Sequence, residues 1–143
     1  MNPAPATDLP EELLSLCDYI TPNETETEAL TGISVSSVSD AQKASDELHK
    51  MGVKTPIITL GEKGAFLHGY GLIDSFKIAP VVETTGAGDA FNGAFAAALS
   101  EGQAPLEAVT FGCATAGISV TRAGTAPSMP IRSEVEKILA TRL

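Results

Sequence analysis

The sequence predicts an α/β protein built as a three-layer α/β/α sheet, with a helical C-terminal third. Three observations carry this prediction. Helical and strand patterns alternate through the first half of the chain, and the run Val53–Leu60 is apolar and β-branched, as in a buried central strand. Residues 89–143 are mostly helical in pattern. Strands that alternate with helices are typical of a layered α/β sheet, and 143 residues is the length of one domain.

The first half begins with short elements. Residues 2–10 are rich in proline and predict an extended loop, and a short leucine stripe over Glu11–Cys17 predicts a helix. Asp18–Ile20 is expected to form a brief strand. A helix is expected from Asn23 to about Thr31, with Gly32 as its stop.

A second helix is expected to be capped by Asp40 and closed by Gly52, because Ala44, Leu48 and Met51 share one helical face. The central strand Val53–Leu60 follows. A tight turn at Gly61–Gly64 then leads into further strands, which are predicted at Ala65–His68, Ile73–Ile78 and Val81–Val82, with a hairpin at Gly69–Gly71.

Three helices are expected in the last part of the chain, over Asp89–Ser100, Pro105 to about Val120, and Ser133–Leu143. Proline is favoured in the first turn of a helix, so Pro105 supports the second start. Serine is a good N-cap, so Ser133 is predicted to cap the third helix.

The composition excludes several classes of function. The net charge is −9, from 18 acidic and 9 basic residues, which argues against binding nucleic acid. An anionic ligand would have to be held by backbone dipoles and metal ions. The mean hydropathy of the chain is +0.14. No apolar run approaches the ~18 residues of a membrane span. The first residues show no signal-peptide pattern. A membrane partner is therefore not expected.

The cysteines and histidines follow no metal-binding pattern. Cys17 and Cys113 stand far apart, and two free thiols suggest a reducing cytoplasm. His49 and His68 are expected in unrelated contexts, one at the surface and one on a strand. A metal site at either histidine is disfavoured because neither has a second ligand at helical or hairpin spacing.

The segment Thr84–Asp89, followed by the helical run Ala90–Leu99, is the most informative part of the chain. The glycines Gly86 and Gly88 let the backbone approach a ligand closely. The helix behind them directs free N–H groups and about half a positive charge at the turn, which favours an anion. A carboxylate at Asp89, beside a bound phosphate, is suited to take a proton from an attacking hydroxyl.

An ordinary β-α connection explains the same residues equally well, with Asp89 stabilising the helix dipole. Two other phosphate motifs are excluded. A dinucleotide fingerprint needs a third glycine where Phe91 stands, and no Walker string G-x-x-x-x-G-K-[ST] occurs.

Several motifs together resemble the C-terminal half of the ribokinase-like (PfkB) sugar kinase family, in the family's order and over essentially the whole chain. Gly86–Gly93 matches the signature G-A-G-D-x-F-x-G, which is the most specific of them. The other similar segments are Asn2–Ala6, Thr21–Glu26 with the N-x-x-E motif, Thr59–Gly64 with the nucleotide loop T-x-G-x-x-G, and the closing loop Ala123–Ser128.

This resemblance implies an ATP-dependent kinase in which Asp89 is the base and contacts the sugar hydroxyl. Gly86, Ala87 and Gly88 would offer N–H groups to the transferred γ-phosphoryl. Glu26 would help to place Mg²⁺ through water, with Asn23 near the phosphates. From the residues alone, Asn23 and Glu26 are better explained as a capping box, and the two roles are compatible.

The resemblance also assigns nucleotide contacts and a monovalent cation. Thr59, Gly61, Glu62, Lys63 and Gly64 would line the ATP site, although T-x-G-x-x-G by itself is a plain hairpin turn. Cys113 matches a position that flanks the purine, and a buried helix thiol explains it equally well. Potassium is implied beside the anion site, where the matching positions are Glu83, Thr85, Ser119, Arg122, Gly124 and Ser128. The family commonly carries Asp where this chain has Glu83, and Arg122 could offer only its carbonyl.

The family's N-terminal half, which carries the lid and most sugar contacts, has no counterpart here. The chain therefore resembles a partial kinase domain over residues 1–143. Exposed core surface and a raw sheet edge favour self-association or a companion chain that supplies the missing half. Three functions stay open: phosphorylation of the 5-hydroxyl of ribose by ATP, nucleotide binding without turnover, and an inert half-domain.

Overall fold

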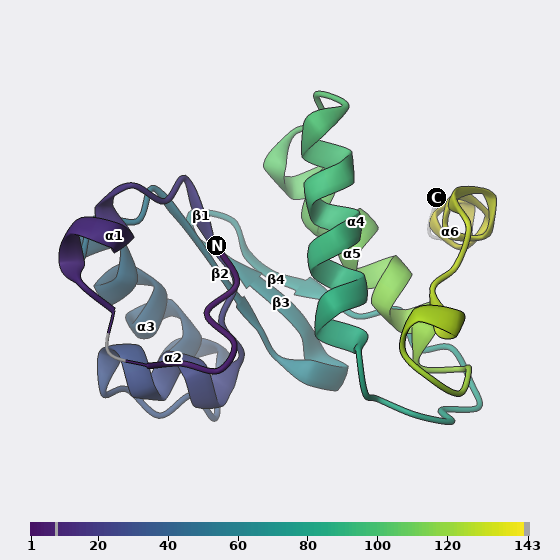
Figure 1. Cartoon of the computed structure of the whole chain (residues 1–143), viewed down its shortest axis with the longest axis horizontal. Helices are drawn as coiled ribbons and strands as arrows, with labels where there is room; N and C mark the ends of the chain where they lie inside the picture. Colours follow the sequence, from purple (N-terminus) through teal and green to yellow (C-terminus); the bar gives the residue numbers. More distant parts are fainter. Residues whose placement is uncertain (8, 142–143) are drawn as a thin grey trace. The chain divides into compact units, whose positions relative to one another are not determined.

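The protein was analysed as a computed structural model that describes residues 1–7 and 9–141. The chain divides into two compact units, Met1–Ile73 and Asp74–Leu143. Each unit has its own secondary structure and is described in turn (Figure 1).

The first unit combines three helices with a mixed sheet. Its helices are α1 (Glu11–Ser15), α2 (Glu24–Thr31) and α3 (Val38–Lys50). The strands are β1 (Tyr19–Ile20), β2 (Thr55–Thr59), β3 (Gly64–Leu67) and β4 (Gly71–Asp74), in that order across the sheet. This combination confirms the predicted α/β class.

The strand pairing fixes where the loops of this unit lie. β1 runs parallel to β2, with Tyr19 opposite Thr55, and β2 runs antiparallel to β3, with Thr59 opposite Ala65. The short 3-10 helix Gly61–Lys63 joins β2 to β3. The segment T-x-G-x-x-G is therefore the connection of a hairpin, as the plain reading of that pattern predicts.

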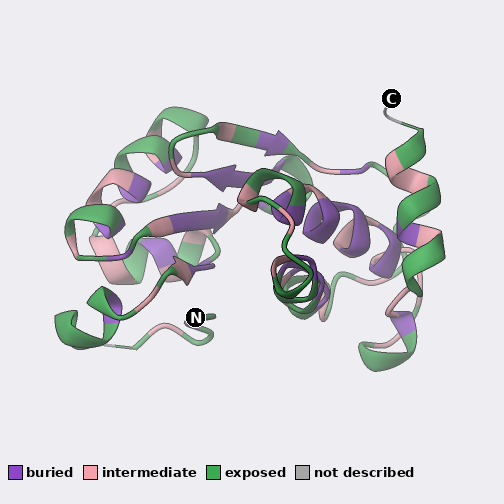
Figure 2. Ribbon diagram, turned by 90° about the horizontal axis from the view of Figure 1, so that it is seen from above, coloured by how far each residue is buried: buried purple, intermediate pink, exposed green. Residues whose placement is uncertain are grey.

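The core of the first unit lies where α3 packs on β2 and β3 (Figure 1). Ala44 and Leu48 of α3, and Ile58 and Phe66 of the strands, are at most 1% exposed. Figure 2 shows buried residues along these strands and on one side of the helices. The apolar face that the sequence predicts for this helix is the face that packs on the sheet.

The start of α3 differs from the prediction. Ser37, and not Asp40, is the N-cap. The Ser37 hydroxyl accepts from the Asp40 amide at 3.2 Å, and the Asp40 carboxylate accepts from the Ser37 amide at 3.1 Å. This reciprocal capping box satisfies two free amides and begins the helix earlier than expected. The hydrogen bonds from Ser37 and Ser36 lower the pKa of Asp40 to about 2.

The two histidines share one environment, contrary to the expectation of unrelated contexts. Their rings stack with centroids 4.7 Å apart. His68 lies in the turn after β3 and not on a strand. The C-terminal turn of α3 carries His49 next to this turn because α3 contacts β3. Among the described residues, no group of three or more potential ligands is placed to hold a metal ion.

The second unit consists of three helices, α4 (Ala87–Ser100), α5 (Pro105–Ser119) and α6 (Arg132–Ala140), and a 3-10 turn, Ala126–Ser128. α5 packs against both α4 and α6. The contact between α5 and α4 is close because Gly112 has no side chain. A Cβ at this position would lie 2.8 Å from the ring of Phe91. The predicted helical C-terminal part is confirmed.

The strand predicted at Ile73–Ile78 is present only at its first two residues, and the strand predicted at Val81–Val82 is wrong. β4 ends at Asp74, and the chain then runs irregularly to the start of α4. Phe76 is buried against α5, where a Cβ on Gly117 would lie 2.5 Å from the Phe76 carbonyl oxygen. The amides of Val82 and Glu83 donate to the Val120 carbonyl at the end of α5, so this segment bonds to a helix and not to a sheet.

Ser133 does not cap α6, because Ile131 occupies the N-cap position. The Glu134 carboxylate accepts from the Ile131 amide at 3.0 Å and so satisfies one free group at this helix start. The expected helix extends to residues 142–143, which lie outside the described residues. Within the described part of the chain, no helix has the length and apolar character needed to cross a membrane.

Candidate active site

The turn before α4 has the geometry of an anion site. Gly86 is the N-cap, with φ of +83°, a conformation that favours glycine. The Ala90 amide donates to the Gly86 carbonyl at 2.9 Å, and the Ala87 amide donates to Thr84 at 3.2 Å. Asp89 is the third helical residue and is exposed, as is Gly88. The carboxylate of the predicted base therefore lies at the surface and does not point into the interior.

The amides of Gly86, Gly88 and Asp89 remain open among the described residues. The Ala87 amide, which was expected to bind the γ-phosphoryl group, is already bonded to the Thr84 carbonyl. Among residues 1–7 and 9–141, nothing accepts a hydrogen bond from the backbone amide of Gly86, Gly88 or Asp89, and no side chain caps α4. A Cβ on Gly88 would meet no atom within 4 Å. Free helix-start amides in open space can bind an anion, and the helix dipole adds to the attraction.

A second segment of the same unit, the loop after α5, supports the turn. Val82 and Glu83 donate to the Val120 carbonyl at 2.7 and 3.1 Å. The carboxylate of Glu83 accepts from the Gly124 amide at 2.7 Å. Because a Cβ on Gly86 would lie 3.2 Å from the side chain of Thr125, that side chain packs directly against the turn. Three hydrogen bonds and one packing contact thus hold the end of α5 and the loop after it to the segment that precedes α4.

Among the predicted cation-site residues, Glu83 and Gly124 are brought into contact by this bond. Ser119 and Ser128 are buried at 3% and 1% exposure, and each hydroxyl donates to a carbonyl of its own segment, Ala116 and Thr125 respectively. Thr85 is exposed. The Ser119 carbonyl accepts the Arg122 amide at 3.1 Å. Carbonyl and carboxylate oxygens are suitable ligands for a hard cation, so these residue types are compatible with the implied potassium ion, which stays a prediction.

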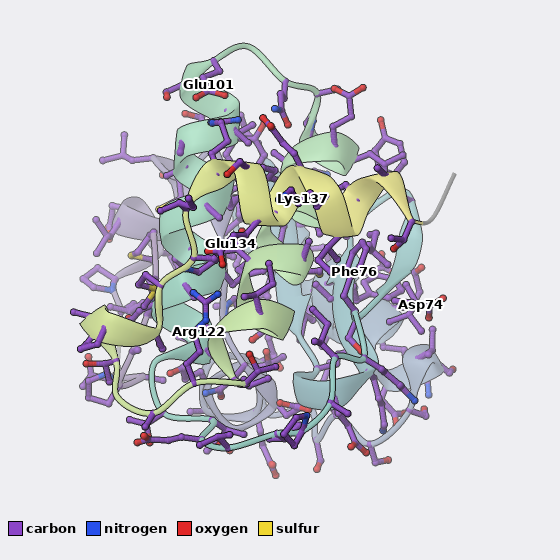
Figure 3. The ribbon with its side chains drawn as sticks, turned by 90° about the vertical axis from the view of Figure 1, so that its right-hand side faces the viewer. Asp74, Phe76, Glu101, Arg122, Glu134 and Lys137 are labelled. Atoms are coloured by element: carbon purple, nitrogen blue, oxygen red, sulfur yellow. The ribbon has the colours of Figure 1, made fainter. Side chains whose placement is uncertain are left out.

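Arg122 has a role that the sequence does not reveal. Its guanidinium donates to both carboxylate oxygens of Glu134, at 2.5 and 3.3 Å, and Figure 3 shows the two side chains facing each other below α6. The hydrogen bonds from Arg122 and from the Ile131 amide hold the pKa of Glu134 below its usual value. The Glu134 spacing from Ile131 is a detectable helix-start signal, but nothing in the sequence pairs it with Arg122.

The first unit holds most of the predicted nucleotide residues, all except Gly88 and Cys113. The Thr59 amide and hydroxyl both donate to the Pro22 carbonyl, at 2.9 and 3.4 Å. Since Pro22 directly precedes Asn23, these bonds place the start of α2 beside the loop Gly61–Gly64. Gly64 has φ of +114° and ψ of −132°, which only glycine adopts readily. The N-x-x-E motif at Asn23 and the T-x-G-x-x-G motif at Thr59 begin 36 residues apart in the sequence. They nevertheless lie next to each other in the structure.

The other residues of this group have partners of their own. The Lys63 ammonium donates to the Ser36 carbonyl at 3.2 Å, while Glu62 belongs to the exposed 3-10 turn. Asn23 and Glu26 form the predicted capping box, with both bonds at 2.9 Å. Cys113 is not in this unit; it is 5% exposed on α5, as expected for a buried helix thiol.

The Glu26 carboxylate fits an outer-sphere role toward Mg²⁺. One of its oxygens accepts from the Asn23 amide, and the carboxylate keeps further lone pairs for a metal-bound water. Mg²⁺ retains several waters and is commonly held through one or two carboxylates and phosphate oxygens. A capped helix start and a magnesium contact are therefore compatible in the same side chain.

Comparison with known proteins decides the family. Residues 1–132 match the pfkB family of carbohydrate kinases. The chain belongs to this family. Its resemblance to ribokinase-like kinases, inferred from the signature at Gly86–Gly93, is thereby confirmed.

Individual relatives agree in sequence and in fold. The chain is 48% identical to a ribokinase of Haemophilus influenzae over 97% of this chain, and 42% identical to a ribokinase of Arabidopsis thaliana over 93% of it. A crystal structure of ribokinase from Thermotoga maritima matches 97% of this chain with a TM-score of 0.87 and 46% identity. The α/β fold is that of the ribokinase-like kinases.

The chain spans less than half the length of these relatives. It covers 46% of the Haemophilus protein, 36% of the curated Arabidopsis protein and 48% of the Thermotoga structure. The structure of the Arabidopsis ribokinase in complex with ribose and ATP matches with a TM-score of 0.88 and 40% identity, over 93% of this chain and 44% of that chain.

Proposed function

We propose that this chain is the nucleotide- and phosphoryl-binding portion of an ATP-dependent sugar kinase that phosphorylates the 5-hydroxyl of ribose. The observation that carries the proposal is the turn before α4, where the open amides of Gly86, Gly88 and Asp89 lie next to the exposed carboxylate of Asp89. Relatives that match most of this chain are ribokinases, one of them solved with ribose and ATP. These relatives favour a kinase over a binding module without turnover.

In the proposed reaction, the Asp89 carboxylate takes the proton of the sugar hydroxyl as its oxygen attacks the γ-phosphorus of ATP. The bond from that phosphorus to the bridging oxygen breaks, and ADP leaves with the bridging oxygen. The open amides of Gly86 and Gly88, together with that of Asp89, stabilise the negative charge on the transferred phosphoryl group in the transition state. Asp89 thus supplies the base and the helix start supplies the electrostatic stabilisation.

The remaining predicted residues support this chemistry. Asn23, Thr59 and the loop Gly61–Gly64, including Glu62 and Lys63, are proposed to contact the nucleotide, as is Cys113. Mg²⁺ would be held with the help of Glu26 and would neutralise phosphate charge. Potassium would be held by oxygen atoms of the segments Glu83–Thr85 and Ser119–Ser128, beside the turn.

The whole activity also needs a sugar site, which in the relatives belongs to a protein about twice as long. We therefore propose that this chain associates with itself or with a segment that supplies the rest of the domain. Large apolar side chains at the surface are consistent with association: Leu16 is 80% exposed, Ile131 67% and Val81 63%. A monodisperse monomer in solution scattering would count against this part of the proposal.

The test is a coupled assay of ADP release from Mg-ATP with ribose, beside calorimetric titration with Mg-ATP. Asp89→Asn should lower turnover by about 10²–10⁴-fold and leave Mg-ATP binding intact, because only the base is lost. Glu101→Gln, just beyond the far end of α4, is the matched control and should keep full turnover. Activity that persists in Asp89→Asn refutes the assigned base, and failure of the wild-type chain to bind Mg-ATP refutes the nucleotide-binding role.

A further inference from the structure

Among the residues that the structure describes, two ion pairs of similar exposure join helix α6 to the rest of the second unit. Glu134 pairs with Arg122, and the two side chains are 37% and 36% exposed. Arg132 pairs with Glu101, at 43% and 48% exposure, and also lies 5.1 Å over the Phe111 ring. Figure 3 shows Glu101 and Arg122 on opposite sides of α6. Both pairs are made by the first turn of this helix, and they join it to two different segments.

Only the Arg122–Glu134 pair connects α6 to the loop that supports the turn before α4. Arg122 lies in the loop 121–128, in which the Gly124 amide donates to Glu83 and the Thr125 side chain packs on Gly86. Glu101 directly follows α4, whose 14 residues separate it from the turn by about 20 Å. The first pair therefore has a short contiguous path to the turn and the second does not.

We propose that Glu134 is a positioning residue for the phosphoryl-binding turn, acting through Arg122 and the loop 121–128. Its functional meaning rests on the proposed kinase function, whereas the coupling itself rests only on these contacts. An arginine that donates to both oxygens of one carboxylate is fixed in orientation as well as in distance. Fixing Arg122 in this way holds Gly124 against Glu83 and Thr125 against Gly86.

The structure of the loop explains why it needs an external anchor. Gly124 has φ of +84°, and the bonds within the loop are short-range: the amide and the hydroxyl of Ser128 both donate to the Thr125 carbonyl, at 3.1 and 2.6 Å. These bonds shape the loop, so its position relative to α4 depends on the Gly124–Glu83 bond and on the packing of Thr125 against Gly86. Glu134 supplies a bond from a different helix, so loss of this bond should free the loop without unfolding α5 or α6.

The experiment compares Glu134→Gln with Glu101→Gln by amide hydrogen exchange. Glutamine keeps an oxygen that can accept from the Ile131 amide, so the start of α6 is retained while the charged partner of Arg122 is lost. Two protected amides report on the site, Gly124 bonded to Glu83 and Ala87 bonded to Thr84. In Glu134→Gln we expect both to exchange about fivefold faster or more. In Glu101→Gln both should exchange as in the wild type.

Further measurements distinguish a specific effect of Glu134 on the turn from a general contribution of α6 to stability. Equal acceleration in both variants, or none in Glu134→Gln, overturns the proposal, because α6 would then contribute only general stability. Glu134→Asp keeps the charge and should restore part of the protection; it replaces Glu134→Gln if that variant fails to fold. Calorimetry with Mg-ATP should show affinity about fivefold weaker in Glu134→Gln and unchanged in Glu101→Gln. Selective acceleration of exchange in a chain that does not bind Mg-ATP refutes the kinase function and leaves the positioning role standing.

Discussion

Replacing Gly88 by alanine should stabilise the protein and at the same time weaken its proposed ligand site. Gly88 has no positive φ, and a Cβ there would meet no atom within 4 Å. Alanine in a helix is favoured over glycine by about 0.5–1 kcal/mol, chiefly through the lower entropy of the unfolded chain. We expect the free energy of unfolding to rise by up to that amount, measured by guanidinium denaturation.

The same methyl group lies beside an amide that is proposed to bind the γ-phosphoryl group. If it prevents one charge-assisted hydrogen bond, binding loses about 1.5–3 kcal/mol, which corresponds to about 10- to 150-fold in Kd. Calorimetric titration with Mg-ATP measures this change. The expected result is therefore a more stable protein with a weaker ligand site.

Gly93→Ala is the matched control. Gly93 lies in the same helix, is exposed, and also offers open space to a Cβ. It should give a similar gain in stability with unchanged Mg-ATP affinity. If Gly88→Ala binds Mg-ATP as tightly as Gly93→Ala does, no ligand approaches this turn closely and the reasoning is wrong. A loss of stability in Gly88→Ala would contradict the open space seen at this position.

Three further outcomes are expected. Gly117→Ala should lower the free energy of unfolding by about 1–3 kcal/mol in guanidinium denaturation, because its Cβ would lie 2.5 Å from the Phe76 carbonyl oxygen; a neutral result would mean that residues 75–77 do not pack on α5. Ser37→Ala should cost about 1 kcal/mol through the loss of a capping bond to the Asp40 amide, and a change within error would argue against this cap. The pKa of Asp40 is about 2 in the folded protein against 3.8 for the free side chain, so its stabilising effect is complete above about pH 5 and lost as the pH falls toward 2. Denaturation midpoints of wild type and Asp40→Asn should therefore converge over this range, and a constant difference would contradict the hydrogen bonds to Ser36 and Ser37.

The sequence by itself determined the local elements and the identity of the turn. The β-branched run at Val53–Leu60 predicted β2, and Gly32, Pro105 and the pair Asn23–Glu26 predicted helix ends that are present. These succeed because capping, backbone conformation and burial act within a few residues. The residue order Thr84–Asp89 also predicted that Asp89 lies in the first turn of a helix. This holds because Gly86 is the N-cap and so sets where α4 begins.

The tertiary structure decided which segments that are distant in the sequence lie next to each other. Val81 and Val82 have strand-forming side chains, yet the amides of Val82 and Glu83 bond to the Val120 carbonyl, a partner almost 40 residues away. The pairing of Arg122 with Glu134 and the packing of Thr125 on Gly86 likewise join segments that no short pattern connects. Each depends on how α5 packs against α4 and α6, because helix packing is set by the summed fit of many side chains and local sequence does not encode that sum.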